Sequence, residues 1–166
     1  MNRNTPRPAE RHGRASMAPE GHDPYRREQK IPEPSFCPDC GAVFEAGHWQ
    51  WKEPLSALAP KVTCPACLRQ REHDPAGYLL VEGPFLQAHR DELVHLLERR
   101  AEQARSEHPL QRLMGMAPQP DGGLMFTTTS VRLARALGSA LEHAYHGELE
   151  VHASPDQDLV RLRWSR

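Results

Sequence analysis

The sequence Cys37-Pro38-Asp39-Cys40-Gly41 is matched further along by Cys64-Pro65-Ala66-Cys67-Leu68, and these two stretches contain all four cysteines of the chain. A Cys-x-x-Cys turn places two thiolates on one side of the backbone. Two such turns that face each other supply four sulfurs at tetrahedral angles. Pro38 fixes φ, and Gly41 permits a positive φ that lets backbone N–H groups point at sulfur. The spacing predicts one zinc site with the ligands Cys37, Cys40, Cys64 and Cys67.

Other interpretations of the cysteines fit less well. Two disulfides would require an oxidising compartment, and a redox motif needs only one Cys-x-x-Cys pair, beside a βαβ pattern. A catalytic zinc ion keeps an open coordination position, which four cysteine ligands close. We therefore expect Zn²⁺ as a structural cofactor.

The composition is that of a small protein with a modest core. The chain has 166 residues, of which 38% are hydrophobic and 6% aromatic, and it contains 16 prolines. The formal net charge of −1 gives no overall basic character that would indicate nucleic acid binding. We find neither an apolar run of membrane-spanning length nor the apolar core of a signal peptide. With reduced cysteines, this predicts a cytoplasmic protein.

The chain divides into three predicted segments. Residues 1–35 are rich in proline, poor in apolar side chains and weakly basic, which predicts a disordered N-terminal arm. Residues 36–82 form the predicted zinc ribbon, with short strands at 43–45 and 48–51 and a loop or helical turn at 55–60. A further strand at 78–82 either closes the ribbon or opens the next domain.

Residues 83–166 have the predicted order helix, strand, strand, helix, strand, strand. The helices are expected at 84–106 and 131–146, where apolar residues recur at helical spacing. The strands are expected at 110–116, 124–128, 148–153 and 159–164. We predict an α+β fold, in which the ribbon is followed by a helix and a ββαββ sandwich with a four-stranded antiparallel sheet.

Two pairs of residues are candidates for nucleic acid binding. Trp49 and Trp51 share one face of a predicted strand, where they either stack on unpaired bases or cover the metal knuckles. Arg132 and Arg135 lie near the start of a helix, where cations oppose the macrodipole. Either phosphate is their intended neighbour or an acid such as Glu150 pairs with them.

Several motifs outside the cysteines carry a family resemblance. They are Glu107-His108-Pro109-Leu110, Thr128-Thr129, Leu133-Ala134-Arg135-Ala136-Leu137-Gly138 and Ala144-Tyr145-His146-Gly147-Glu148-Leu149. With the two Cys-Pro-x-Cys pairs, they resemble a group of small uncharacterised bacterial zinc-ribbon proteins. The chain is more distantly similar to the N-terminal region of the adaptor family that exports the large ribosomal subunit from the eukaryotic nucleus, and to its archaeal relatives. Those adaptors have more cysteine pairs and longer C-terminal domains, so nuclear transport does not carry over.

The resemblance implies a zinc-stabilised module that binds ribosomal RNA or a ribosomal protein. Two hypotheses follow: a ribosome- or RNA-associated factor, and a cytosolic protein–protein adaptor or regulator whose zinc is purely architectural. We find no nucleophile with a base at a recognisable spacing, no glycine-rich phosphate loop and no His-Glu-x-x-His motif. We therefore expect a protein that is not an enzyme and that binds neither membranes nor a small-molecule substrate.

Overall fold

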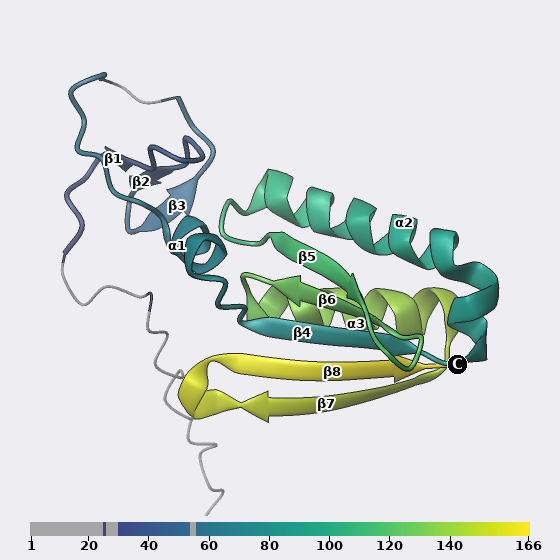
Figure 1. The fold of residues 1–166 in the computed structure, drawn as a ribbon. Coiled ribbons are helices and arrows are strands. Elements are labelled where there is room, and N and C mark those ends of the chain that lie inside the picture. The colour runs from purple at the N-terminus through teal and green to yellow at the C-terminus, as the bar shows by residue number, and fades with distance from the viewer. Residues whose placement is uncertain (1–24, 26–29, 54–55) are drawn as a thin grey trace, which may run out of the picture.

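A computed structural model describes Tyr25, residues 30–53 and residues 56–166. Most of the predicted disordered arm, and part of the predicted loop at 55–60, lie outside the described residues. Helices and two separate sheets make an α+β protein (Figure 1). Among the described residues, no helix combines the length and the apolar character needed to span a membrane.

The first cysteine pair lies in the connection between the first two strands of the smaller sheet. Its strands are β1 (Ser35–Phe36), β2 (Val43–Glu45) and β3 (His48–Gln50), paired antiparallel in the order β1-β2-β3. The turn between β2 and β3 uses Ala46 and Gly47, both with positive φ. A small core of the four cysteines with Ala42, Trp49 and Ala66 lies beside this sheet.

Helix α1 (Pro65–Glu72) begins at the second cysteine pair and was not predicted. Its N-cap is Cys64, whose sulfur accepts a hydrogen bond from the backbone N–H of Cys67 at 3.4 Å. The helix has no apolar stripe of helical period. The apolar periodicity that usually predicts a helix is therefore absent from the sequence. The cysteine turn at Cys64 begins this helix instead.

The larger sheet has the strand order β5-β6-β4-β8-β7. Its strands are β4 (Gly77–Glu82), β5 (Leu113–Pro118), β6 (Leu124–Thr128), β7 (Glu148–Ser154) and β8 (Leu159–Ser165), with a short 3₁₀ turn, Pro155–Gln157, between the last two. β4 pairs antiparallel with β6 and parallel with β8. The predicted four-stranded antiparallel sheet was therefore wrong in strand number and in one pairing.

The predicted sheet was wrong because the strand at 77–82, β4, belongs to it. The predicted boundary placed it with the ribbon, but β4 lies in the centre of the larger sheet and joins β6 to β8. Its parallel partner β8 is far away in the sequence, and no local pattern specifies such a pairing. From β4 to β7 the elements follow the order β-α-β-β-α-β of a split βαβ motif, and β8 lies between β4 and β7.

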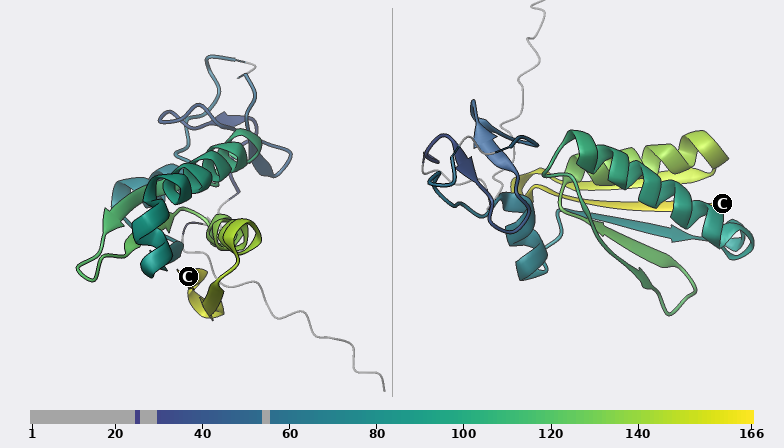
Figure 2. Two further views of the ribbon diagram at one scale, coloured as in Figure 1. Left: turned by 90° about the vertical axis from the view of Figure 1, so that its right-hand side faces the viewer. Right: turned by 90° about the horizontal axis from the view of Figure 1, so that it is seen from above.

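Helices α2 (Pro84–Glu107) and α3 (Val131–Tyr145) cover one face of the larger sheet (Figure 2). Leu93 and Leu97 of α2 and Leu137 and Leu141 of α3 are buried against apolar side chains of β4, β6 and β8. Trp164 of β8 is fully buried in the same core. The helical spacing of leucines and alanines predicted both helices to within two residues at each end.

Candidate metal centre

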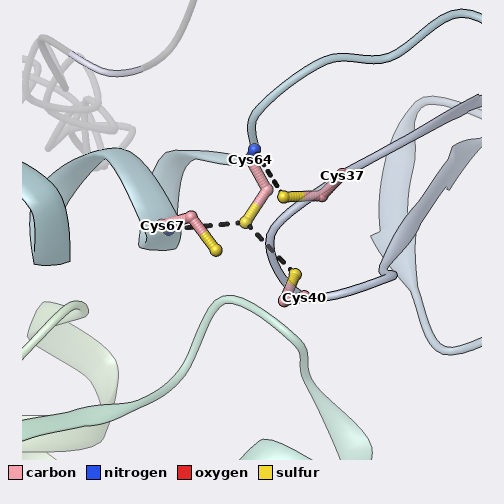
Figure 3. A group of neighbouring side chains, drawn as sticks. All are labelled: Cys37, Cys40, Cys64 and Cys67. Carbon is pink, nitrogen blue, oxygen red and sulfur yellow. Dashed lines mark hydrogen bonds between the residues drawn. The ribbon is translucent and has the colours of Figure 1, made fainter.

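The two cysteine pairs meet as the spacing predicted. Cys37 and Cys40 follow β1, whereas Cys64 and Cys67 lie at the start of α1 (Figure 3). Their four sulfurs all lie within 4.8 Å of one another, and the described residues form no other metal-ligating cluster of this kind. The Cys40 and Cys64 sulfurs are 3.8 Å apart. A tetrahedron with Zn–S bonds of about 2.3 Å has an edge of about 3.8 Å, so the donor set fits a tetrahedral thiolate site.

Backbone N–H groups point at the sulfurs. The N–H of Cys64 donates to Cys37 Sγ at 3.3 Å, and the N–H of Cys67 donates to Cys64 Sγ at 3.4 Å (Figure 3). Gly41 has a φ of 79° and donates its N–H to the Cys37 carbonyl at 2.8 Å. The first two bonds fix the direction of the Cys37 and Cys64 sulfurs, and the third closes the turn between Cys37 and Gly41.

Arg112 is a charged side chain in direct contact with three of the cysteines. Its Nη2 lies 3.0 Å from Cys40 Sγ and 3.6 Å from Cys64 Sγ, and its Nη1 lies 3.2 Å from Cys67 Sγ. The residue is only 5% exposed. Four thiolates around a divalent metal carry an overall charge of about −2. The guanidinium therefore supplies positive charge and hydrogen bonds where the metal centre needs them.

The backbone around Arg112 holds its side chain in place. Its Nε donates to the Pro109 carbonyl at 2.7 Å. Its backbone N–H donates to Thr129 Oγ1 at 2.9 Å, and the Thr129 hydroxyl donates to the Leu110 carbonyl at 2.6 Å. The segment before β5 and the end of β6 thus hold Arg112 against the cysteines. Arg112 therefore links the cysteine centre to the larger domain.

Burial and hydrogen bonding act on the thiols in opposite directions. Burial raises the pKa of Cys64 well above its usual range and raises the pKa of Cys67 to about 11, although Arg112 acts to lower the latter. Burial also acts to raise the pKa of Cys40, but the Ala42 backbone and the Arg112 guanidinium outweigh it, so that this pKa is lowered. The Arg112 guanidinium therefore does not by itself outweigh burial at Cys64 and Cys67. A divalent cation does, because coordination favours the thiolate.

The predicted tryptophans occupy two different environments. Trp49 is 9% exposed and packs beside the cysteines, with its ring 5.4 Å from the ring of Phe44. Trp51 is 38% exposed, and its Nε1 donates to the Arg105 carbonyl at the end of α2 at 2.6 Å. Trp49 thus covers the cysteine knuckles, and Trp51 bridges the small sheet and the larger domain.

The predicted arginines line a cavity between α1 and the start of α3. Its volume is about 490 Å³, and it is bounded by Pro65, Ala66, Arg69, Leu110, Thr129, Ser130, Val131, Arg132, Arg135 and Asp158. Arg69 is buried, 3.6 Å from Asp74 and 4.0 Å from Asp158. Within the described part of the chain, neither Arg132 nor Arg135 has a carboxylate at ion-pair distance. Glu150, the acid considered as their partner, lies 3.9 Å from His152.

Sequence reasoning missed Arg112 and Thr129 as parts of the centre. Arg112 is 45 residues from Cys67, and no spacing rule connects an arginine to a distant cysteine pair. The only sequence signal was indirect: the motifs Glu107–Leu110 and Thr128-Thr129 flank the segment that carries Arg112. Comparisons of the chain with protein-family models, with curated proteins and with solved structures found no match.

Proposed function

We propose that this protein is a non-enzymatic zinc-binding factor that associates with RNA, including ribosomal RNA. The zinc ion is structural, because four cysteine ligands complete its tetrahedral coordination and leave no open position for a substrate. Bound zinc would supply the cross-link between the small sheet and α1. The soft thiolate donors favour zinc over hard cations such as Mg²⁺.

The observation that carries the RNA proposal is the basic cavity at the start of α3. Three arginines line it, against one acid, Asp158, which lies near Arg69. Arg132 and Arg135 are exposed, and neither has a carboxylate partner among the described residues. Phosphate is the ligand that suits two available guanidinium groups. The N-terminal end of a helix adds favourable backbone N–H groups and a positive dipole.

The small net charge of the chain is compatible with this proposal if the RNA contact is local. Sequence-independent RNA affinity comes mainly from phosphate neutralisation by arginine and lysine. A cavity with two available arginines supplies only a few such contacts. We therefore expect modest affinity and a shallow salt dependence, rather than the steep dependence of a highly basic protein.

The test is binding of a short fluorescent single-stranded RNA, measured by anisotropy over a series of salt concentrations. The double variant R132Q/R135Q should weaken binding about tenfold and reduce the salt slope by about 1–2. The matched control is R99Q/R100Q, which removes the same charge from exposed positions on α2 outside the cavity. Failure of the wild-type protein to bind RNA at low salt would overturn the proposal, as would equal losses in the two double variants.

A second experiment addresses the ribosome. The tagged protein should co-sediment with ribosomal particles from lysate at low salt and dissociate as the salt concentration rises. Nuclease treatment should release it. Retention of a protein partner after nuclease treatment would instead favour the adaptor hypothesis.

A further inference from the structure

The face of the larger sheet opposite α2 and α3 contains a hollow of about 300 Å³. Tyr78 and Leu80 of β4 point to this face because they alternate with Leu79 and Val81, which are buried under the helices. Met125 of β6, Glu150 and His152 of β7, and Arg161 of β8 also line the hollow. In the described part of the chain, both long helices pack on the other face of this sheet.

Tyr78 is the tyrosine that lines this hollow. It lies on the central strand, opposite Thr127 of β6 and Arg161 of β8. The guanidinium carbon of Arg161 lies over the face of the tyrosine ring, 5.2 Å from its centre, in a cation–π contact. Aromatic rings and arginine guanidinium groups are both surfaces on which unpaired bases stack, and this contact joins one of each.

The charged groups at the hollow are Arg161, Arg163 and Glu150, with Glu82 beside Arg163. Arg163 forms an ion pair with Glu82, and this neutralises the acid on β4. Arg161 has no carboxylate partner among the described residues, so its charge is available to a phosphate. Glu150 and His152, 3.9 Å apart at the rim, can accept and donate hydrogen bonds at a base edge.

We propose that this hollow binds an unpaired base of single-stranded RNA, stacked against the Tyr78–Arg161 pair. The inference rests on the proposed function and adds to it a base-binding surface separate from the arginine cavity at α3. In this proposal Tyr78 stacks on the base, in place of Trp49 and Trp51, which the sequence had suggested for that role. The hollow provides stacking and polar groups, whereas the cavity at α3 provides phosphate contacts.

The experiment compares a short uridine oligomer with an oligomer of equal length and charge in which ribose spacers replace the bases. The wild-type protein should bind the uridine oligomer about tenfold more tightly, because only this oligomer can stack. Tyr78→Leu should abolish the preference and Tyr78→Phe should keep it. R132Q/R135Q should weaken binding of both oligomers while the preference remains.

The outcomes separate the two claims. If the wild-type protein binds neither oligomer at low salt, both the proposed function and this inference fail. If it binds both oligomers equally, or if Tyr78→Leu keeps the preference, the base-binding inference fails and RNA association stands. If Tyr78→Leu does not fold, the inference is tested instead by NMR, from the backbone amide chemical-shift changes of the wild-type protein on addition of the uridine oligomer. Uridine-dependent shifts at Tyr78, Met125 and Thr127 are expected, and shifts confined to other residues would overturn the inference.

Discussion

The guanidinium Nη2 of Arg112 lies 3.0 Å from the sulfur of Cys40, although the two residues are 72 positions apart in the chain. The same side chain reaches Cys64 and Cys67. Arg112 precedes β5 in the larger domain, whereas Cys40 belongs to the small sheet region. Charge balance at the cysteines and attachment of the two parts of the protein therefore depend on the same residue.

Arg112→Gln should weaken both metal retention and folding stability. The substitution leaves buried thiolates without their cationic neighbour, and breaking a buried charged contact costs about 3–5 kcal/mol. We expect faster zinc release to a competing chelator and a clearly lower thermal midpoint. Arg112→Lys should be intermediate, because lysine keeps the charge but lacks the planar fork that contacts three sulfurs. Arg99→Gln, at an exposed position on α2, is the control. Wild-type chelation kinetics in the Arg112→Gln variant would show that the contact is dispensable.

Tyr25 should make stability depend on alkaline pH. Its hydroxyl oxygen lies 2.6 Å from Glu72 Oε2 and 2.8 Å from Asp74 Oδ2, so its single hydrogen is donated to one of the two carboxylates at a time. The tyrosine ring lies 4.4 Å from the guanidinium carbon of Arg69. Burial and the two carboxylates raise the pKa of Tyr25 above its ordinary value of 10.0. The folded state thus holds the phenolic proton more tightly than the unfolded state. The resulting stability is fully present below pH 10 and is lost as the pH rises through the folded pKa.

The corresponding measurement is the free energy of unfolding of the wild-type protein and of Tyr25→Phe between neutral and strongly alkaline pH. At neutral pH the variant should be less stable by about 1.5–3 kcal/mol, because it loses a hydrogen bond to a charged acceptor. Above pH 10 the difference should shrink. A difference that stays constant across the whole range would contradict the assigned titration.

Gly77→Ala should destabilise the larger domain. A Cβ at Gly77 would lie 2.4 Å from the Cβ of Ala134 and 2.5 Å from Thr128 Oγ1, so β4 and α3 would have to separate. Overpacking of this kind costs about 1–3 kcal/mol. Gly115→Ala in β5 is the matched control, because its nearest contact would be Thr127 Oγ1 at an ordinary 3.7 Å. Chemical denaturation should show a lower midpoint for the first variant only. Equal denaturation midpoints for the two variants would mean that α3 moves away from β4 without loss of stability, and would contradict the prediction.

The elements that sequence reasoning predicted correctly depend on local patterns. The Cys-x-x-Cys spacing brings thiolates together whatever the rest of the chain does, and the apolar periodicity of α2 and α3 marks their buried faces. The turn at Asp121 and Gly122 likewise separates β5 from β6, and β6 was predicted with its observed bounds. These features need only neighbouring residues to be specified.

The features that sequence reasoning missed depend on distant residues. The parallel pairing of Gly77 with Val160, and of Tyr78 with Arg161, is set by the packing of the whole sheet. The contact of Arg112 with the cysteines follows from its hydrogen bonds with Thr129, 17 residues away. Local sequence patterns do not specify either of these long-range contacts. This is why the candidate centre was predicted through its ligands and not through the arginine beside them.

The measurement that tests the central claim most directly is the zinc content of the purified protein and of Cys64→Ser by native mass spectrometry, with near-UV circular dichroism on the same samples. The account predicts one zinc ion per wild-type chain and its loss in the variant. The near-UV signal of the buried Trp49 should fall, while the far-UV signal of α2 and α3 should persist, because their core is separate from the cysteines. A wild-type protein that folds around the cysteines without metal, or a variant that stays fully metallated, would contradict it.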